Sequence, residues 1–160
     1  MNKEIQKKWV EALRSGKYRQ GEESLWSSYQ EVLNYVDDDG QEHWEEVGET
    51  YCCLGVLCQI VDPEWREFFY DNGMDLQTTD LSDPVEHESG LDNNHVRSNL
   101  AELNDTGYSF DQIATIIEET DLVEKTIYEV SEMLIEIARH DQEASTVNVK
   151  EVIHEVIGGF

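Results

Sequence analysis

The apolar stretch YCCLGVLCQIV, residues 51–61, decides how this chain folds. Its apolar side chains would lie on every side of a helix, whereas a helix at the protein surface keeps a polar face. The pattern therefore predicts a buried central helix, with Cys53, Leu54 and Leu57 inside the core. Gly55 lies in the middle, where glycine costs about 1 kcal/mol relative to alanine. A closely approaching backbone would account for a glycine at this position.

The three cysteines, Cys52, Cys53 and Cys58, all belong to this stretch. An odd, clustered set is not a disulfide framework, so we expect buried, reduced thiols. Acidic residues directly upstream would raise the pKa of the Cys52 thiol, which argues against a nucleophile. The chain has no glycine-rich phosphate loop, no Cys-x-x-Cys pair and no His-Glu-x-x-His helix. We therefore assign no catalytic residue, no metal site and no cofactor, and consider an enzyme improbable on this pattern.

Amphipathic segments flank the central stretch on both sides. Apolar residues recur at helical spacing in five segments, which are residues 3–15, 94–104, 109–119, 121–141 and 147–157. Residues 31–47 alternate around Asp38-Asp39-Gly40-Gln41, which predicts a β-hairpin. Residues 73–93 lack periodicity and are predicted to form a long loop. The expected fold is α+β, mainly α, with about six helices around the buried central helix and one small β-hairpin.

The domain organisation follows from the same pattern. Residues 1–120 form the predicted core domain. Residues 121–160 form a helical extension that either packs on the core or lies at a dimer interface, so a homodimer is one expected assembly. No apolar run approaches the roughly 20 residues that span a bilayer, and the first residues do not resemble a signal peptide. A cytoplasmic location is the default expectation.

Charge is the strongest compositional feature, because the chain has a formal net charge of -25. Residues 1–20 hold six basic and two acidic residues, whereas residues 21–160 hold five basic and 34 acidic residues. Such a body repels phosphate backbones and anionic membrane surfaces, so direct nucleic-acid or membrane binding is disfavoured. A protein partner with a basic surface would be attracted. Solubility or adaptation to a salty medium would explain the acidity equally well.

Three segments resemble a group of small, largely uncharacterised accessory proteins of tailed bacteriophages. They are WVEALRSGKYRQG at residues 9–21, YCCLGVLC at residues 51–58, and LAELNDTGYSFDQIATIIEE at residues 100–119. The family often has a basic run after the first segment, where this chain has GEESLW at residues 21–26. This departure puts an anion-binding role at that position in doubt. The resemblance implies expression in an infected bacterial cytoplasm and carries no activity to particular residues.

Two functions remain open at this point. The first is a non-catalytic phage accessory protein that binds and inhibits a host factor, such as a defence component, and whose acidity imitates the charge of a nucleic acid. Its candidate anchors are Trp26, Tyr29 and Trp44, and its candidate docking carboxylates are Glu129, Glu132 and Glu136. The second is a binder or enzyme for an anionic small molecule such as a nucleotide. Its candidate residues are Lys17, Arg19, Arg66 and Arg97.

Overall fold

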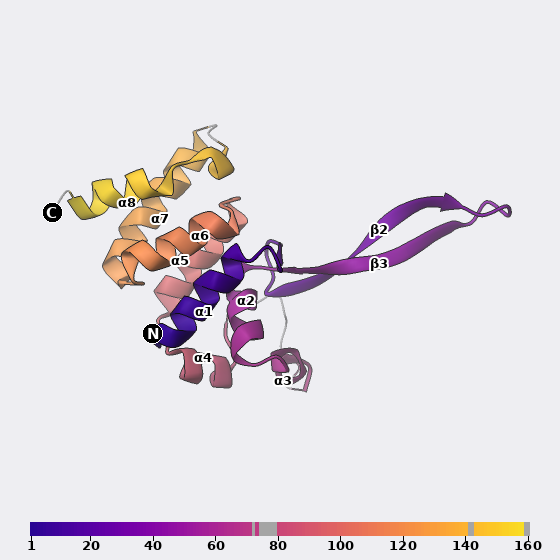
Figure 1. The fold of residues 1–160 in the computed structure, drawn as a ribbon, viewed down its shortest axis with the longest axis horizontal. Coiled ribbons are helices and arrows are strands. Elements are labelled where there is room, and N and C mark those ends of the chain that lie inside the picture. The colour runs from indigo at the N-terminus through magenta and orange to yellow at the C-terminus, as the bar shows by residue number, and fades with distance from the viewer. Residues whose placement is uncertain (72, 74–79, 141–142, 159–160) are drawn as a thin grey trace.

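In a computed structural model, the chain forms a helical body from which one long β-hairpin projects (Figure 1). The structure describes residues 1–71, 73, 80–140 and 143–158, and along residues 28–35 and 42–47 it describes the backbone alone. The described helices are α1 (Lys3–Arg14), α2 (Cys53–Val61), α3 (Trp65–Asp71), α4 (Asp83–Ser89), α5 (Asn94–Asp105), α6 (Phe110–Thr120), α7 (Glu124–Arg139) and α8 (Val149–Gly158). The strands are β1 (Arg19–Gln20), β2 (Trp26–Val36) and β3 (Glu42–Tyr51). A short 3₁₀ helix, Ala144–Thr146, lies between α7 and α8.

The α+β, mainly α prediction is confirmed, but the described residues form eight α-helices instead of about six. One helix that the sequence pattern missed is α4, inside the predicted loop at residues 73–93. Its seven residues are too few to show a helical period. Its ends nevertheless carry ordinary signals, because Pro84 lies in the first turn and Gly90 ends the helix at φ 66°.

The central helix α2 is buried as predicted. Cys53, Leu54 and Leu57 are all 0% exposed. Gly55 faces the chain segment that leads into β2, and a Cβ atom at this position would lie 1.8 Å from the carbonyl oxygen of Leu25. A side chain cannot fit in that space, so glycine is required by the close crossing of two backbones.

The strands form a mixed sheet in the order β1-β3-β2 instead of the single small hairpin expected. β2 and β3 are antiparallel from Trp26 opposite Tyr51 to Val36 opposite Glu42, so the hairpin extends well beyond the predicted residues 31–47. β1 pairs with β3 in parallel, with Gln20 opposite Tyr51. This long-range pairing supports the C-terminal end of β3, and no local sequence pattern could reveal it.

The helices pack into one continuous core. α1 lies against α6 and α2, α5 against α7, and α8 against both α6 and α7. Apolar residues of α7 and α8, such as Leu134 and Ile153, are 0% exposed and belong to the same core cluster as α2. Pairing of two copies through residues 121–160 stays a prediction. Among the described helices, none combines the length and the apolarity that crossing a membrane requires.

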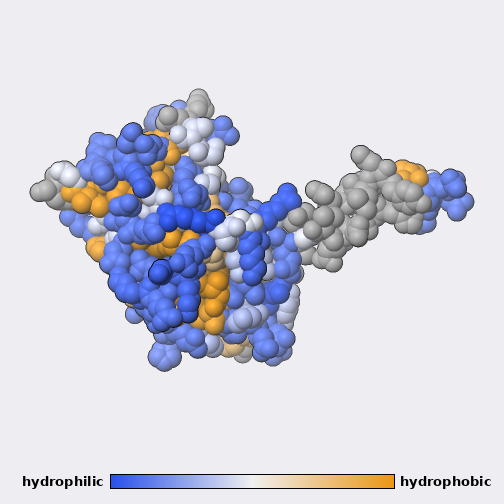
Figure 2. Space-filling model, viewed as in Figure 1, coloured by the Kyte–Doolittle hydropathy of each residue, from blue (hydrophilic) through white to orange (hydrophobic). Residues whose placement is uncertain are grey.

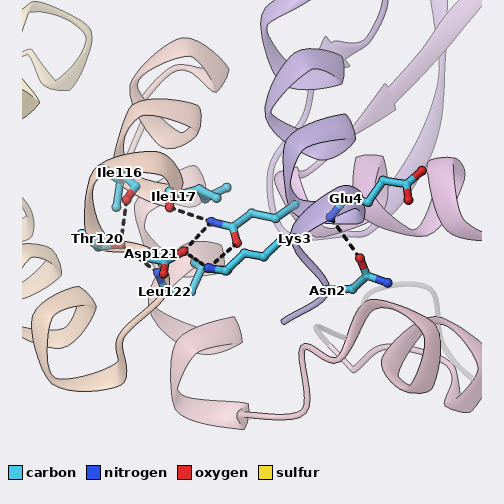
Figure 3. Close-up of polar contacts among 9 residues, drawn as sticks. Asn2, Lys3, Glu4, Ile116, Ile117, Thr120, Asp121 and Leu122 are labelled. Carbon is cyan, nitrogen blue, oxygen red and sulfur yellow. Dashed lines mark hydrogen bonds and ion pairs between the residues drawn. The ribbon is translucent and has the colours of Figure 1, made fainter.

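Polar contacts fasten α1 to the end of α6 (Figure 3). Lys3 forms an ion pair with Asp121, which ends α6 in the left-handed conformation at φ 50°. Gln6, which is 7% exposed, donates its amide hydrogens to the Ile117 carbonyl and to Asp121, at 3.2 Å in each case. These bonds satisfy groups at the helix end that would otherwise lack partners.

Gly55→Ala should lower the free energy of unfolding by about 3 kcal/mol, because the new methyl group would collide with the Leu25 carbonyl. The measurement is urea unfolding followed by circular dichroism. Gly158→Ala is the matched control, since nothing lies within 4 Å of its Cβ position and alanine is the better helix former. Equal stability of the two variants would show that α2 and the Leu25 segment do not cross closely.

Candidate functional site

The most prominent surface feature is the β2–β3 hairpin, residues 26–51, which we call the arm. It extends away from the helical body along most of its length (Figure 1). Its sequence contains eight carboxylates and no lysine or arginine. The strand register places Glu31 directly opposite Glu45. Like charges at opposed positions destabilise a strand pair, so charge repulsion at this position opposes the pairing of β2 with β3.

The tip of the arm is an ordered turn. The Asp37 carboxylate accepts hydrogen bonds from the backbone N–H groups of Asp39 (3.0 Å) and Gln41 (2.9 Å). Gly40 takes the left-handed conformation at φ 79°, which favours glycine. These constraints hold the exposed carboxylates of Asp38 and Asp39 outward.

One apolar side chain accompanies these carboxylates. Val36 is 57% exposed, and Figure 2 shows an apolar patch beside the hydrophilic end of the arm. Neither Asp38 nor Asp39 has an ion pair within the described part of the chain. The tip therefore offers two unneutralised carboxylates next to an apolar contact, in a preformed turn.

A cluster of four side chains fixes the base of the arm. The Arg66 guanidinium lies 4.8 Å from the ring centroid of Trp26, and its Nη1 lies 3.0 Å from Oε1 of Glu49. The Tyr51 hydroxyl donates to Oε2 of Glu49 at 2.7 Å. This hydroxyl and Arg66 lower the pKa of Glu49, while burial and the carboxylate raise the pKa of Tyr51 to about 12. These contacts join β2, β3 and α3 at the point where the arm leaves the body.

A pocket of about 360 Å³, which we call the basal pocket, opens beside this cluster. Its lining residues are Lys17, Tyr18, Arg19, Gly48, Glu49, Tyr51 and Gln59. The rings of Tyr18 and Tyr51 meet edge to face, with centroids 5.4 Å apart. The Lys17 ammonium lies 5.4 Å from the centroid of the Tyr18 ring. The pocket therefore combines cationic, aromatic and carboxylate walls.

The four candidate anion-binding residues are divided between two places. Lys17 and Arg19 line the basal pocket, and Arg66 reaches its edge through Glu49. Arg97 lies elsewhere and is 5% exposed. Its guanidinium binds Glu86 at 3.0 Å and the Leu91 carbonyl at 2.8 Å, so it joins α4 to α5.

The candidate docking residues also occupy separate surfaces. Trp26 belongs to the base of the arm, whereas the side chains of Tyr29 and Trp44 lie outside the described residues. Figure 1 shows α7, the helix of the candidate docking carboxylates, on a different side of the body from the arm. Glu129 pairs with Lys125 at 3.7 Å, Glu136 pairs with Arg139 at 3.7 Å, and Glu132 is exposed. Two of the three are thus partly neutralised within their own helix.

The three thiols are buried around α2 and form no disulfide. Burial raises the pKa of Cys52 to about 11 and the pKa values of Cys53 and Cys58 well above the usual value. At neutral pH they are therefore protonated and packed as small apolar side chains. Within the described residues, no three His, Cys, Asp or Glu side chains gather as a metal site would require.

Comparison with known proteins yields one partial match. A family model described as a domain of unknown function (DUF8296) matches residues 1–33. No curated protein and no solved structure matches the chain. The matched residues comprise α1, β1 and the first part of β2. They include Lys17, Tyr18 and Arg19 of the basal pocket and Trp26 at the base of the arm.

The folded protein should not react with a thiol reagent such as Ellman's reagent at pH 8, because all three cysteines are buried and protonated. In denaturing urea three thiols per chain should react. The measurement is the absorbance of the released thiolate over time. Rapid release of one equivalent from the native protein would reveal an accessible cysteine and reopen the question of a nucleophile.

Glu49→Gln should reduce stability at neutral pH and have less effect in acid. The pKa of Glu49 in the folded protein lies below the usual 4.5, so its contribution is present above 4.5 and disappears as the pH falls through the lower folded value. The effect should be modest, because the carboxylate is 45% exposed. Urea midpoints of both proteins across pH 3 to 7, about the range of carboxylate titration, provide the measurement. Glu67→Gln, an equal charge change on α3, is the control; a pH-independent difference for Glu49→Gln would contradict the assignment.

Proposed function

We propose that this protein is a non-catalytic binding protein that docks its acidic arm onto a basic surface of another protein. The observation that carries the proposal is the arm itself, a projecting hairpin with eight carboxylates and no basic residue. Its outer part contacts no described helix strongly, since the principal contacts of β2 are with β3. A surface that protrudes this far is available to a partner before any other part of the chain.

The energetics of the arm favour a partner. A two-stranded hairpin without a third strand is marginally stable in water, and here Glu31 opposes Glu45 as well. Lysine and arginine side chains of a partner would neutralise these carboxylates and remove the repulsion. Docking would therefore stabilise the arm at the same time as it forms the complex.

The charge of the whole chain supports rapid association. Residues 21–160 hold 34 acidic and five basic residues, and a field of this kind steers a basic partner toward the arm. Steering of this type is screened by salt, so association should slow as the ionic strength rises. The exposed Val36 and the aromatic residues of the arm would provide contacts that salt does not weaken.

The resemblance of three segments to accessory proteins of tailed bacteriophages supports the choice of a host protein as the partner. We infer that the complex forms in the host cytoplasm and inhibits its target by covering a basic functional surface. Where that surface normally binds a nucleic acid, the row of carboxylates would compete with phosphates for the same basic side chains. The basal pocket favours a second, compatible activity, which is the binding of an anionic small molecule, because Lys17 and Arg19 line one cavity.

The test compares two double charge reversals that change the net charge equally. One is Asp38→Lys with Asp39→Lys at the tip of the arm, and the other is Glu132→Lys with Glu136→Lys on α7. Wild-type protein first captures partners from bacterial lysate at low salt. Each captured protein is then purified, and its association rate and activity are measured with all three chains at low and high salt.

The arm reversal should slow association about tenfold at low salt and flatten the salt dependence, because it removes the steering charge at the contact. The α7 reversal should have a smaller effect, since Glu136 is already paired with Arg139. Equimolar wild-type protein should also inhibit the captured target. A larger loss with the α7 reversal, or equal binding by all three chains, would contradict docking through the arm.

A further inference from the structure

Lys17 differs from the other basic residues in its contacts. The chain has 36 acidic and 11 basic residues, so a carboxylate partner is expected for every cation. Nine basic side chains do form such ion pairs; they are Lys3, Lys7, Lys8, Arg14, Arg66, Arg97, Lys125, Arg139 and Lys150. In the described part of the chain Lys17 has no ion pair, and its ammonium instead lies over the ring of Tyr18.

The position of Lys17 makes it available to bind an anion in the basal pocket. Lys17 is exposed at the rim of the basal pocket, beside Arg19, in a local segment that is basic although the chain is acidic. An ammonium with no carboxylate partner keeps its full capacity to bind an anion. Arg19, which has a contact of its own, lines the same pocket and adds positive potential to it.

Two further lining residues of the pocket, Glu49 and Gln59, offer hydrogen-bonding groups of a different kind. The Glu49 carboxylate is held in place by Tyr51 and Arg66 and would repel an anionic group. Gln59 Oε1 accepts a hydrogen bond from Trp65 Nε1 at 3.3 Å, which orients its amide NH₂ group as the remaining donor. A ligand that fits would therefore carry an anionic group for Lys17, hydrogen-bond donors for the Glu49 carboxylate and an acceptor for the Gln59 amide.

Two tyrosines connect Lys17 to Glu49, because the Lys17 ammonium lies over the Tyr18 ring, Tyr18 packs against Tyr51, and the Tyr51 hydroxyl donates to Glu49. The Tyr18 ring is half-buried, its edge packs against Tyr51, and one of its faces already attracts the Lys17 ammonium. A flat ring could lie on this face while Lys17 turns to the anionic end of the same ligand. The volume of about 360 Å³ is within the range of small-ligand pockets.

We propose that the basal pocket binds a nucleoside monophosphate whose base donates hydrogen bonds, with guanosine monophosphate as the best fit. Lys17 contacts the phosphate, Tyr18 stacks on the base, and Glu49 accepts hydrogen bonds from the base edge. Guanine presents two adjacent donors, N1–H and the exocyclic amino group, and both can reach one carboxylate. Uracil presents a single donor between two acceptors, and the carboxylate repels those acceptors. This site is independent of docking through the arm, and either can fail without the other.

The experiment titrates the full chain with guanosine monophosphate, uridine monophosphate and inorganic phosphate by isothermal calorimetry. Guanosine monophosphate should bind saturably and more tightly than the other two. Lys17→Ala should weaken both nucleotides about tenfold, the usual effect of losing one charge-assisted contact. Glu49→Gln should abolish the preference for guanosine over uridine monophosphate while nucleotide binding persists.

Lys7→Ala is the control, because Lys7 is an exposed lysine on the same N-terminal segment that pairs with Glu11 at 4.0 Å, away from the pocket. It should leave both nucleotide affinities unchanged. Circular dichroism of every variant confirms the fold before titration. The proposal is overturned by an absence of saturable nucleotide binding, by equal affinity for guanosine monophosphate and phosphate, or by equal losses in Lys7→Ala and Lys17→Ala.

Discussion

The buried side chain of Asn104 is the contact on which the rest of the fold depends. Its amide is 0% exposed and has partners in two other segments of the chain. Oδ1 accepts from the backbone N–H of Cys53 at 3.2 Å and from Gln20 Nε2 at 3.1 Å, while Nδ2 donates to the Gly21 carbonyl at 2.8 Å. A buried amide that loses such partners leaves several polar groups unsatisfied, each at a cost of about 1–3 kcal/mol. This one residue therefore fixes α5, α2 and the entry to the sheet relative to one another.

Asn104 joins three segments that are far apart in the sequence, residues 9–21, 51–58 and 100–119. The residues that Asn104 contacts in these segments hold the framework of the helical body together. That framework ends where the arm begins, because the segment after Gly21 crosses α2 at Gly55 and continues into β2. A rigid body with a separate projecting element permits the arm to change its charge or its aromatic residues without disturbing the core.

The parts of the fold that the sequence predicts are those with a strong local period or an unambiguous local signal. The all-round apolarity of residues 51–61 and the helical stripes beside it correctly indicated α2 and its neighbours. The full length of the arm was not predictable, because the strand pairing continues to Trp26 opposite Tyr51, and Tyr51 belongs to the apolar stretch that the pattern assigns to a helix. The basal pocket was only half predictable: Lys17 and Arg19 are close in sequence, but Glu49 and Gln59 reach them through the sheet and α2. Arg97 has the same charge as Lys17 and Arg19, but it is buried and paired with Glu86, which composition does not reveal.

The arm and the basal pocket place opposite demands on one electrostatic field. A net charge of -25 would attract a basic protein from a distance, but it would repel a nucleotide that approaches the pocket. The pocket must therefore retain an anion by contacts of a few ångströms, where the local charge of Lys17 and Arg19 outweighs the distant carboxylates. Salt screens the long-range repulsion more than these short contacts, since charges separated by more than about 8–10 Å are largely screened at physiological ionic strength. Rising salt would consequently weaken the attraction between a basic protein and the arm and reduce the repulsion of an anion from the pocket, so the two proposed interactions should respond in opposite directions to ionic strength.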